Sequence, residues 1–405
     1  MYRQRELTRM VQRAMESLPV VVVTGMRQTG KTTMLLNDHA FAERTYRCLE
    51  EYAYLEAAKN APEDFLGNEE SHTIDEVQLV PELLSAIKVK VDRSRRPGRF
   101  VLSGSSNLLL QSKVTESLAG RALFMELMPM TRRELRQETT RTPFVVSWME
   151  SPPRSVHEEA MLLTPEECLL GGMPPVAVDG ADKGIWFQGF EQTYLERDVR
   201  QLAQVADLAV FRTFFRSAAL RPGGILNLTE LARDVGITQD TARRYIGVLE
   251  TSYSLVRLPA WRRGATARLV KSPKMYLADS GLAAWLNGFG DLPDPLQHRS
   301  WGAILETYVL QNLRAILGAW VPDAHLYYWR EQGRHEVDFI VEHHNSLLAV
   351  ELKWTSRWTP ADLAGLRRFR ELYPSCRTGL LVCRVDRITP LGDGLFAIPI
   401  GTFLS

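Results

Sequence analysis

The sequence predicts an α/β fold built around a parallel sheet, on three observations. Val20 to Val23 form a short apolar run of β-branched residues, as in a strand that is buried on both faces. Strand-like and helix-like stretches then alternate as far as Leu127, an order that places helices on both faces of a parallel sheet. A second group of strand-like stretches begins at His335 and includes a helix, which indicates a second α/β core.

A glycine-rich turn follows the first strand directly and fits the phosphate-binding pattern G-x-x-x-x-G-K-[ST]. In such a loop, backbone N–H groups and the start of the next helix surround a phosphate. Lys31 would bridge the β- and γ-phosphates, and Thr32 would hold Mg²⁺. A chance match is the alternative, but the strand before the loop and the helix after it favour an ATP site. The predicted contacts are Gly25, Met26, Arg27, Gln28, Thr29, Gly30, Lys31, Thr32 and Thr33.

ATP hydrolysis also needs acidic groups at the end of another strand, and Thr73-Ile74-Asp75-Glu76 supplies them. We expect Asp75 to hold Mg²⁺ through its water shell and Glu76 to polarise the attacking water. The strand before them is weak, because Ser71 and His72 stand where apolar residues are expected. An ordinary Asp-Glu pair at a helix start is therefore the alternative.

The other elements of this first unit follow from apolar spacing. Leu7, Val11, Ala14 and Leu18 share one face of a helix that precedes the first strand. In chain order we then expect a helix at 33–36, a strand at 44–49, a strand ending at Asp75, a helix at 81–91 and strands at 99–102 and 123–127. Ligands of such a sheet bind at the carboxyl ends of its strands.

Composition is that of an ordinary globular protein with room for two or three domains. The 405 residues are 45% hydrophobic and 24% charged, and the net charge of +1 argues neither for nor against nucleic acid. Four cysteines without C-x-x-C spacing suggest reduced thiols and no zinc site. No apolar run approaches about 18 residues and the N-terminus lacks a signal-peptide core, so we expect a cytoplasmic protein with no membrane partner.

Four segments, in this order, resemble a known family: GMRQTGKTT, IDEVQLVPELL, FVLSGSSNLLL and ESLAGR. They are similar to bacterial and archaeal AAA+ ATPases that carry a C-terminal domain long left without an assigned function. The resemblance implies ATP and Mg²⁺ as cofactors and Ser105 as the sensor of the γ-phosphate. It also implies that Arg121 acts as an arginine finger on a neighbouring subunit, and hence a homo-oligomer such as a hexameric ring. A structural salt bridge is the alternative for Arg121.

Leu228 to Glu250 match a helix-turn-helix, with Gly236 at the turn and Thr229 and Thr238 as helix caps. The segment Leu255 to Tyr276 then alternates as a hairpin wing would, and it carries six cations, including Lys274. A winged helix of this kind would bind DNA. A protein–protein module with a solvated basic face is the alternative. The predicted DNA contacts are Gln239, Arg243, Arg244, Arg262, Arg263, Arg268 and Lys271.

The last third contains a second group of charged residues. Asp338 lies in a predicted strand, the next strand carries Glu351 and Lys353 on one face, and Glu306 lies in a helix upstream. This set resembles the metal core of the restriction-endonuclease-like PD-(D/E)XK superfamily, in which Mg²⁺ is held against a scissile phosphate. Structural ion pairs are the alternative. Four histidines, His298, His335, His343 and His344, fit no zinc pattern and are expected in loops or at the surface.

We therefore expect an AAA+ P-loop core at residues 1–128, a lid and connector at 129–205, a winged helix-turn-helix at 206–285 and a nuclease-like α/β domain at 286–405. Thr139 to Ser155, with three prolines and no clear period, is predicted as part of the connector. The favoured function is an ATPase motor on duplex or branched DNA, of helicase or branch-migration type. The alternatives are an ATP-gated nuclease and a nucleotide switch that binds DNA or a protein.

Overall fold

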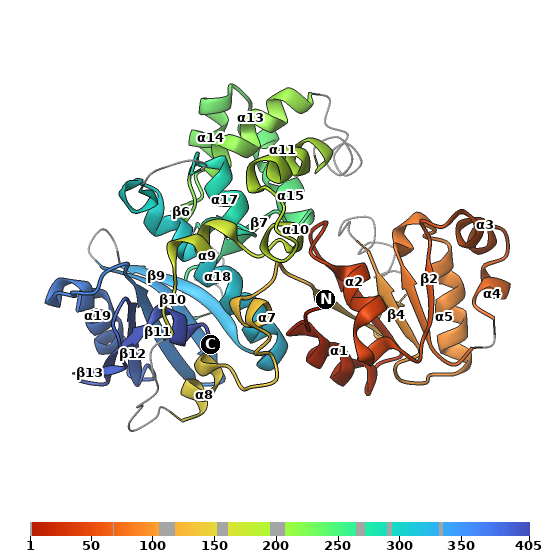
Figure 1. The fold of residues 1–405 in the computed structure, drawn as a ribbon, viewed down its shortest axis with the longest axis horizontal. Coiled ribbons are helices and arrows are strands. Elements are labelled where there is room, and N and C mark those ends of the chain that lie inside the picture. Colours follow the sequence, from red (N-terminus) through yellow and green to blue (C-terminus); the bar gives the residue numbers. More distant parts are fainter. Residues whose placement is uncertain are drawn as a thin grey trace.

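The computed structural model describes residues 2–67, 69–104, 118–151, 161–194, 207–264, 272–289, 294–331 and 335–405. These residues form a five-stranded, a three-stranded and a six-stranded sheet, in that order along the chain. In Figure 1 the five-stranded sheet and its helices lie on one side, and the other two sheets lie together on the other. Three predicted site residues, Ser105, Arg268 and Lys271, lie outside the described residues.

The N-terminal sheet has the strand order β2-β3-β4-β1-β5, with all its pairs parallel. Val20 to Val23 are completely buried, which confirms the prediction of a strand covered on both faces. The strands are β1 (Val20–Thr24), β2 (Thr45–Cys48), β3 (His72–Asp75), β4 (Phe100–Ser103) and β5 (Ala122–Glu126). The helices are α1 (Leu7–Met15), α2 (Lys31–Asn37), η1 (His39–Phe41), α3 (Tyr52–Asn60), α4 (Pro62–Phe65), η2 (Val77–Leu79) and α5 (Leu83–Arg93).

β3 is buried along its whole length although it begins with a histidine. The His72 ring stacks on Phe100 with 5.1 Å between ring centroids. Burial, together with the nearby Arg47, lowers the pKa of His72 to about 4, so the ring is neutral at pH 7. A neutral ring can lie inside a sheet at little cost, which explains how a strand with a weak apolar pattern occupies an interior position.

The middle of the chain is mainly helical around a small antiparallel sheet. Its strands are β6 (Gly224–Ile225), β7 (Leu255–Leu258) and β8 (Lys274–Leu277), in the order β6-β8-β7. Helices α14 (Leu228–Val235) and α15 (Gln239–Thr251) lie where they were predicted, and Gly236 ends α14 in the left-handed conformation. Thr238 caps α15 as predicted, but the prediction for Thr229 is wrong, because Asn227 caps α14 and Thr229 lies within the helix. The other helices are α7 (Arg132–Arg136), α8 (Phe144–Glu150), α9 (Pro165–Leu170), α10 (Pro174–Ala177), α11 (Lys183–Thr193), α13 (Leu208–Ala219) and α17 (Ser280–Leu286).

The predicted connector contains a buried helix, α8, which the sequence analysis missed. Trp148 of this helix is 1% exposed, and its indole packs edge-on against Phe396 with ring centroids 5.0 Å apart. A helix of seven residues is too short for a hydrophobic period to be visible, and its stability comes from packing against distant residues.

The C-terminal sheet is mixed, with the strand order β13-β14-β12-β11-β10-β9. Strands β9, β10 and β11 are antiparallel neighbours, whereas β11, β12 and β14 are parallel. The strands are β9 (His325–Glu331), β10 (His335–His343), β11 (Ser346–Leu352), β12 (Thr378–Cys383), β13 (Thr389–Gly392) and β14 (Leu395–Pro399). The helices are η4 (Pro295–Gln297), α18 (Trp301–Trp320), η5 (Pro360–Leu363), α19 (Ala364–Leu372) and α20 (Ile400–Phe403).

One hydrophobic core joins the middle of the chain to the C-terminal sheet. It includes Phe211 and Tyr245 from the middle helices, Tyr308 from α18 and Val350 from β11. The predicted limit at residue 286 therefore separates segments that share a core. None of the helices in the described ranges is long and apolar enough to cross a membrane.

A turn at Gly172 connects the segment at Met130 to Asp279, the residue that precedes α17. The backbone N–H of Gly172 donates to Asp279 (2.7 Å), and its carbonyl oxygen accepts from Met130 N–H (2.7 Å). A Cβ at Gly172 would lie 2.1 Å from the Met130 carbonyl oxygen, so only glycine fits there. Burial raises the pKa of Asp279 to about 6, although backbone N–H groups from Gly172, Leu282 and Gly281 oppose the shift.

The Asp279 pKa predicts a pH effect on stability. In the unfolded chain this carboxyl titrates near its ordinary pKa of about 4, so between pH 4 and 6 the folded state binds the proton more tightly. Its contribution is therefore greatest below pH 4 and falls as pH rises through 6, by about 3 kcal/mol in all. Asp279→Asn, which cannot ionise, should lose this part of the pH dependence in denaturant unfolding. Parallel pH profiles for the two proteins would contradict the prediction.

Candidate nucleotide site and acidic centre

The predicted phosphate loop lies between β1 and α2, and its backbone is strongly curved. Gly25, Gln28 and Gly30 all have positive φ angles, of 140°, 61° and 93°. A Cβ at Gly25 would lie 2.3 Å from the carbonyl oxygen of Leu127, so this position accepts only glycine. The curvature is that of a loop whose N–H groups can converge on an anion.

Lys31 is the first residue of α2 and is only 5% exposed. Its Nζ donates to the carbonyl oxygens of Gly25 (3.0 Å) and Met26 (2.9 Å), within the same loop. The structure therefore holds the lysine against the curved backbone, where its ammonium and the loop N–H groups can act on one phosphate chain.

Asp75, at the end of β3, is fully buried and receives four hydrogen bonds. Thr32 Oγ1 (2.6 Å) and the Tyr46 hydroxyl (2.9 Å) donate to its Oδ2. The Ser103 hydroxyl and the backbone N–H of Glu76 donate to its Oδ1. The structure thus brings together Thr32 and Asp75, the two residues predicted to hold the Mg²⁺ of ATP, and their oxygen donors suit that ion.

Glu76 follows with a left-handed backbone (φ 57°), which is costly for a residue with a side chain. Burial, followed by the repulsion of Asp75, raises the pKa of Glu76, while a hydrogen bond from Gln78 opposes the shift. A carboxylate held close to the ion site with a raised pKa has the properties of a general base.

Two residues of this site were missed by the sequence analysis, Tyr46 and Ser103. Both contact Asp75 from neighbouring strands, β2 and β4. The available signal was the position of Ser103, a polar residue at the carboxyl end of an apolar strand. Ser105, the predicted sensor, lies outside the described residues.

Arg121 forms the intramolecular contact that was the alternative to an arginine finger. Its Nε lies 2.6 Å from Asp92, and both side chains are partly exposed, at 27% and 45%. An exposed pair of this kind contributes little to stability and can exchange partners.

The predicted DNA-contact residues fall into two places. Gln239, Arg243 and Arg244 are exposed on α15, where Arg243 pairs with Asp240 (2.9 Å). Arg262 and Arg263 instead border a cavity of about 420 Å³ next to β9, because the chain after β7 pairs with that strand through Ala260 and Tyr328. The described cations of the predicted helix and of the predicted wing therefore lie on different elements, α15 and the segment after β7.

Lys274 was predicted as a cation of a basic hairpin wing. The strands β7 and β8 do pair antiparallel, but the prediction that Lys274 belongs to a basic surface is wrong. The residue is 4% exposed, and its ammonium faces carboxylates of the C-terminal unit. Nζ lies 2.6 Å from Glu336, 3.4 Å from Glu306 and 3.8 Å from Asp338. The sequence of a strand alone does not show which of its polar side chains are exposed, because the residues that cover them can come from a much later segment of the chain.

The predicted nuclease-like residues do lie together, around this lysine. Asp338 accepts a hydrogen bond from the backbone N–H of Leu352 (2.9 Å), and Lys353 pairs with Glu351 (2.8 Å). Burial and then Asp338 raise the pKa of Glu306, to about 7, and that of Glu351 well above its usual range.

A divalent metal does not fit this centre as it is arranged. An ammonium already lies among the carboxylates, and the Tyr276 hydroxyl donates to Glu306 (2.9 Å). Among the described residues, three ligand atoms within 4.8 Å of one another occur at Asp323, His343 and His344, not here. That group of three is largely exposed, as predicted for the two histidines.

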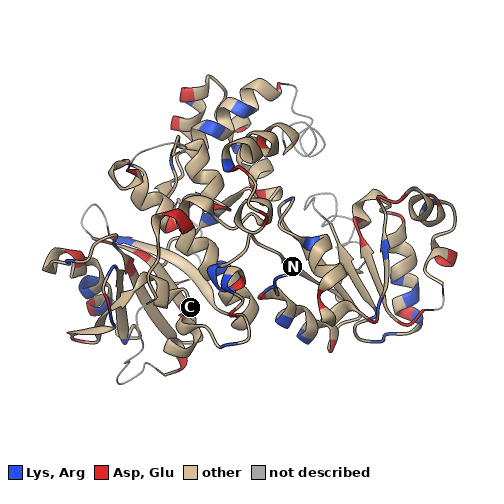
Figure 2. Ribbon diagram, in the orientation of Figure 1, with Lys and Arg blue, Asp and Glu red and all other residues tan. Residues whose placement is uncertain are grey.

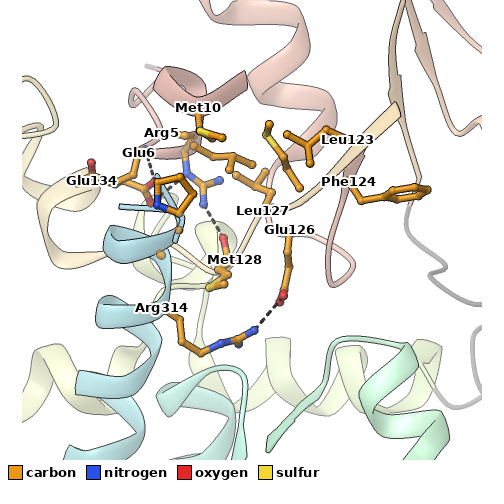
Figure 3. A pocket seen from close by; sticks show the side chains of 15 residues that line it. Arg5, Glu6, Met10, Leu123, Phe124, Glu126, Leu127, Met128, Glu134 and Arg314 are labelled. Atoms are coloured by element: carbon orange, nitrogen blue, oxygen red, sulfur yellow. Dashed lines mark hydrogen bonds and ion pairs between the residues drawn. The ribbon is translucent and has the colours of Figure 1, made fainter. Parts of the chain in front are cut away.

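Another cavity, of about 280 Å³, lies between α1, β5 and α18. Figure 3 shows Arg5 reaching the carbonyl oxygen of Met128, and Arg314 reaching Glu126, at its edge. The residues that line it come from these three elements, from the residues next to them and from Glu134 of α7, and not from the phosphate loop. We therefore assign the cavity to the junction between units.

Comparison with known proteins supports the assignment of the phosphate loop to an ATPase domain. Residues 17–136 match the AAA domain family, so the chain has an AAA-type P-loop ATPase domain. Residues 162–292 and 301–403 match two domains of unknown function, DUF8612 and DUF4143. Uncharacterized protein Rv2008c of Mycobacterium tuberculosis is 30% identical over 407 residues, which cover 99% of this chain and 85% of the relative. The chain therefore belongs to the same family as this mycobacterial protein.

Two solved structures are similar at lower identity. The Walker-type ATPase PABY2304 of Pyrococcus abyssi is 15% identical, with a TM-score of 0.42, over 71% of this chain and 96% of the other. The RuvB Holliday junction branch migration motor of Thermotoga maritima is 18% identical, with a TM-score of 0.28, over 62% of this chain and 86% of the other.

Proposed function

We propose that this protein hydrolyses ATP and acts on DNA as an oligomeric motor of helicase or branch-migration type. The observation that supports the ATPase assignment best is the 2.6 Å hydrogen bond between Thr32 and Asp75, beside a lysine held in the phosphate loop. These three side chains come from two different strand ends, and their convergence is what phosphoryl transfer requires of a P-loop protein.

The residues divide the work of hydrolysis as follows. The curved loop and Lys31 would bind and orient the phosphates, and Thr32 and Asp75 would hold the ion. Mg²⁺ supplies neutralisation of phosphate charge when it is bound with ATP. Glu76 accepts the proton of the attacking water, and the Ser103 hydroxyl keeps Asp75 in position.

Oligomerisation would complete this site. We assign Arg121 to the site of a neighbouring subunit, where its guanidinium would stabilise the charge that develops on the phosphate. Its present partner, Asp92, is 45% exposed, so the pair can separate at moderate cost when subunits meet.

DNA contact would come from α15, as in a winged helix. Gln239, Arg243 and Arg244 are exposed on this helix, and such side chains bind base edges and phosphates. Figure 2 shows Lys and Arg mixed with Asp and Glu throughout the ribbon, so any basic surface is local. The nuclease alternative is less well supported, because Lys274 lies among the carboxylates that would bind its metal.

The first experiment measures ATP hydrolysis with Mg²⁺ in the presence of linear, single-stranded and four-way-junction DNA. We expect DNA to raise the rate at least about tenfold, since the motor must couple turnover to its substrate, and Lys31→Ala to abolish it. Strand separation and protein size in ATP are scored in the same samples. A rate that ignores every DNA, from a protein that stays monomeric in ATP, would remove the motor proposal.

A second prediction concerns the DNA surface. Replacing Arg243 and Arg244 by alanine should weaken duplex binding about tenfold or more at low salt and lessen its salt dependence, because two phosphate or base contacts are lost. Basal ATP hydrolysis should be unchanged. Arg367→Ala/Arg368→Ala on α19 removes the same charge elsewhere and serves as the control; equal weakening by both pairs would contradict a specific role of α15.

A third prediction tests Ser103. Ser103→Ala removes one donor from Asp75 and should lower kcat for ATP hydrolysis by about 10²-fold while nucleotide affinity changes little, because the hydroxyl acts on the position of the ion. Ser85→Ala, at an exposed position of α5, is the matched control. Full activity of Ser103→Ala would show that Asp75 needs no such support.

A further inference from the structure

We infer that Lys274 is an internal cation that closes the acidic centre to divalent metals, and that it connects the middle unit to the C-terminal unit. The lysine belongs to β8, whereas its carboxylate partners belong to α18 and β10. These contacts join segments on the two sides of the domain limit predicted at residue 286. The inference does not depend on ATP hydrolysis or on DNA binding.

The charges around Lys274 explain why it is stable in a buried position. Lys274 is 4% exposed, but three carboxylates, those of Glu336, Glu306 and Asp338, lie within 3.8 Å of its Nζ. An ammonium without partners in this place would cost several kcal/mol. Lys274 is therefore charged, and it neutralises part of the negative charge of the centre.

The geometry is that of an ammonium site and not of a metal site. The Nζ–oxygen distances around Lys274 range from 2.6 to 3.8 Å. A bound Mg²⁺ needs its oxygen ligands at about 2.0–2.1 Å, so the carboxylates would have to move inward while the ammonium moved out. Metal and lysine therefore compete for the carboxylate oxygens of Glu306 and Asp338.

Glu351 is held in a similar way on the other side of Asp338. One of its oxygens pairs with Lys353 at 2.8 Å, while Oε2 is buried and, within the described part of the chain, has no hydrogen-bond partner. Two ammonium groups, those of Lys274 and Lys353, thus lie among the carboxylates of the centre.

A direct consequence is that a divalent metal can bind only when β8 withdraws Lys274. Tyr276, two residues further along β8, donates to Glu306 and would leave with it. Access of metal to the carboxylates is then tied to separation of the middle and C-terminal units, so the centre is closed for as long as these two units stay packed together.

The test is Mn²⁺ binding to the nucleotide-free, full-length protein, measured by titration calorimetry and by the loss of the free Mn²⁺ EPR signal. The natural protein should bind no Mn²⁺ that depends on Asp338. Lys274→Met, which keeps most of the volume and removes the charge, should gain one site at least tenfold tighter than any in the natural protein. Adding Asp338→Asn to Lys274→Met should abolish that site, and Lys183→Met, the same charge change on α11, should gain none.

Two outcomes overturn the inference. If the natural protein binds Mn²⁺ and Asp338→Asn removes the binding, the lysine does not close the centre. If Lys274→Met is folded by circular dichroism and gains no Asp338-dependent site, the lysine is only a structural ion pair. Lys274→Arg, which retains the charge, should behave as the natural protein does. The measurement on the natural protein decides the first point even if Lys274→Met fails to fold.

Discussion

A buried network of charges at the start of α7 joins the phosphate loop to the C-terminal half of the chain. The Glu134 carboxylate accepts from the backbone N–H of Glu6 (2.6 Å) and pairs with Arg5 (3.1 Å). Arg5 in turn donates to the carbonyl oxygen of Thr29 (2.6 Å) inside the loop. Since removal of one member leaves a buried charge unpaired, at a cost of about 3–5 kcal/mol, the position of the loop depends on the whole network.

The same network continues into the other units. The Glu6 carboxylate pairs with Arg133 (2.6 Å) and accepts from the Trp320 indole (2.6 Å) at the end of α18. Arg132 donates to the carbonyl oxygen of Gly401 (3.1 Å), close to the C-terminus. Phosphate loop, α7 and α18 are thus joined by hydrogen bonds between buried groups, which transmit a displacement better than loosely packed apolar contacts do. The proposed motor would need such a rigid connection between its nucleotide site and the surface that contacts DNA.

The features that depend on residues close together in the sequence were predicted well. β1, the phosphate loop and the pair α14–α15 follow from local periodicity and glycine residues, and all lie where expected, although Asn227 and not Thr229 caps α14. The predictions failed for features that depend on contacts between residues far apart in the sequence. Trp148 packs against Phe396, far along the chain, and the position of Ser103 beside Asp75 follows from the pairing of β3 with β4. Lys274 is the clearest case, because the carboxylates that bury it come more than thirty positions later.

The burial of Lys274 also changes how the charge of the protein is distributed. A net charge of +1 leaves little excess positive charge to attract DNA. Lys274, which was predicted on the wing, is buried inside the molecule and does not add to that attraction. Attraction to phosphates at long range must then come from the remaining exposed cations, such as Arg243 and Arg244 on α15. If β8 withdrew Lys274, the lysine would be exposed and the acidic centre would lose a positive charge at the same time. In that open arrangement DNA phosphates could pair with Lys274, and a metal ion could pair with the carboxylates that Lys274 had left. DNA binding near the wing and metal binding in the centre would therefore favour the same open arrangement.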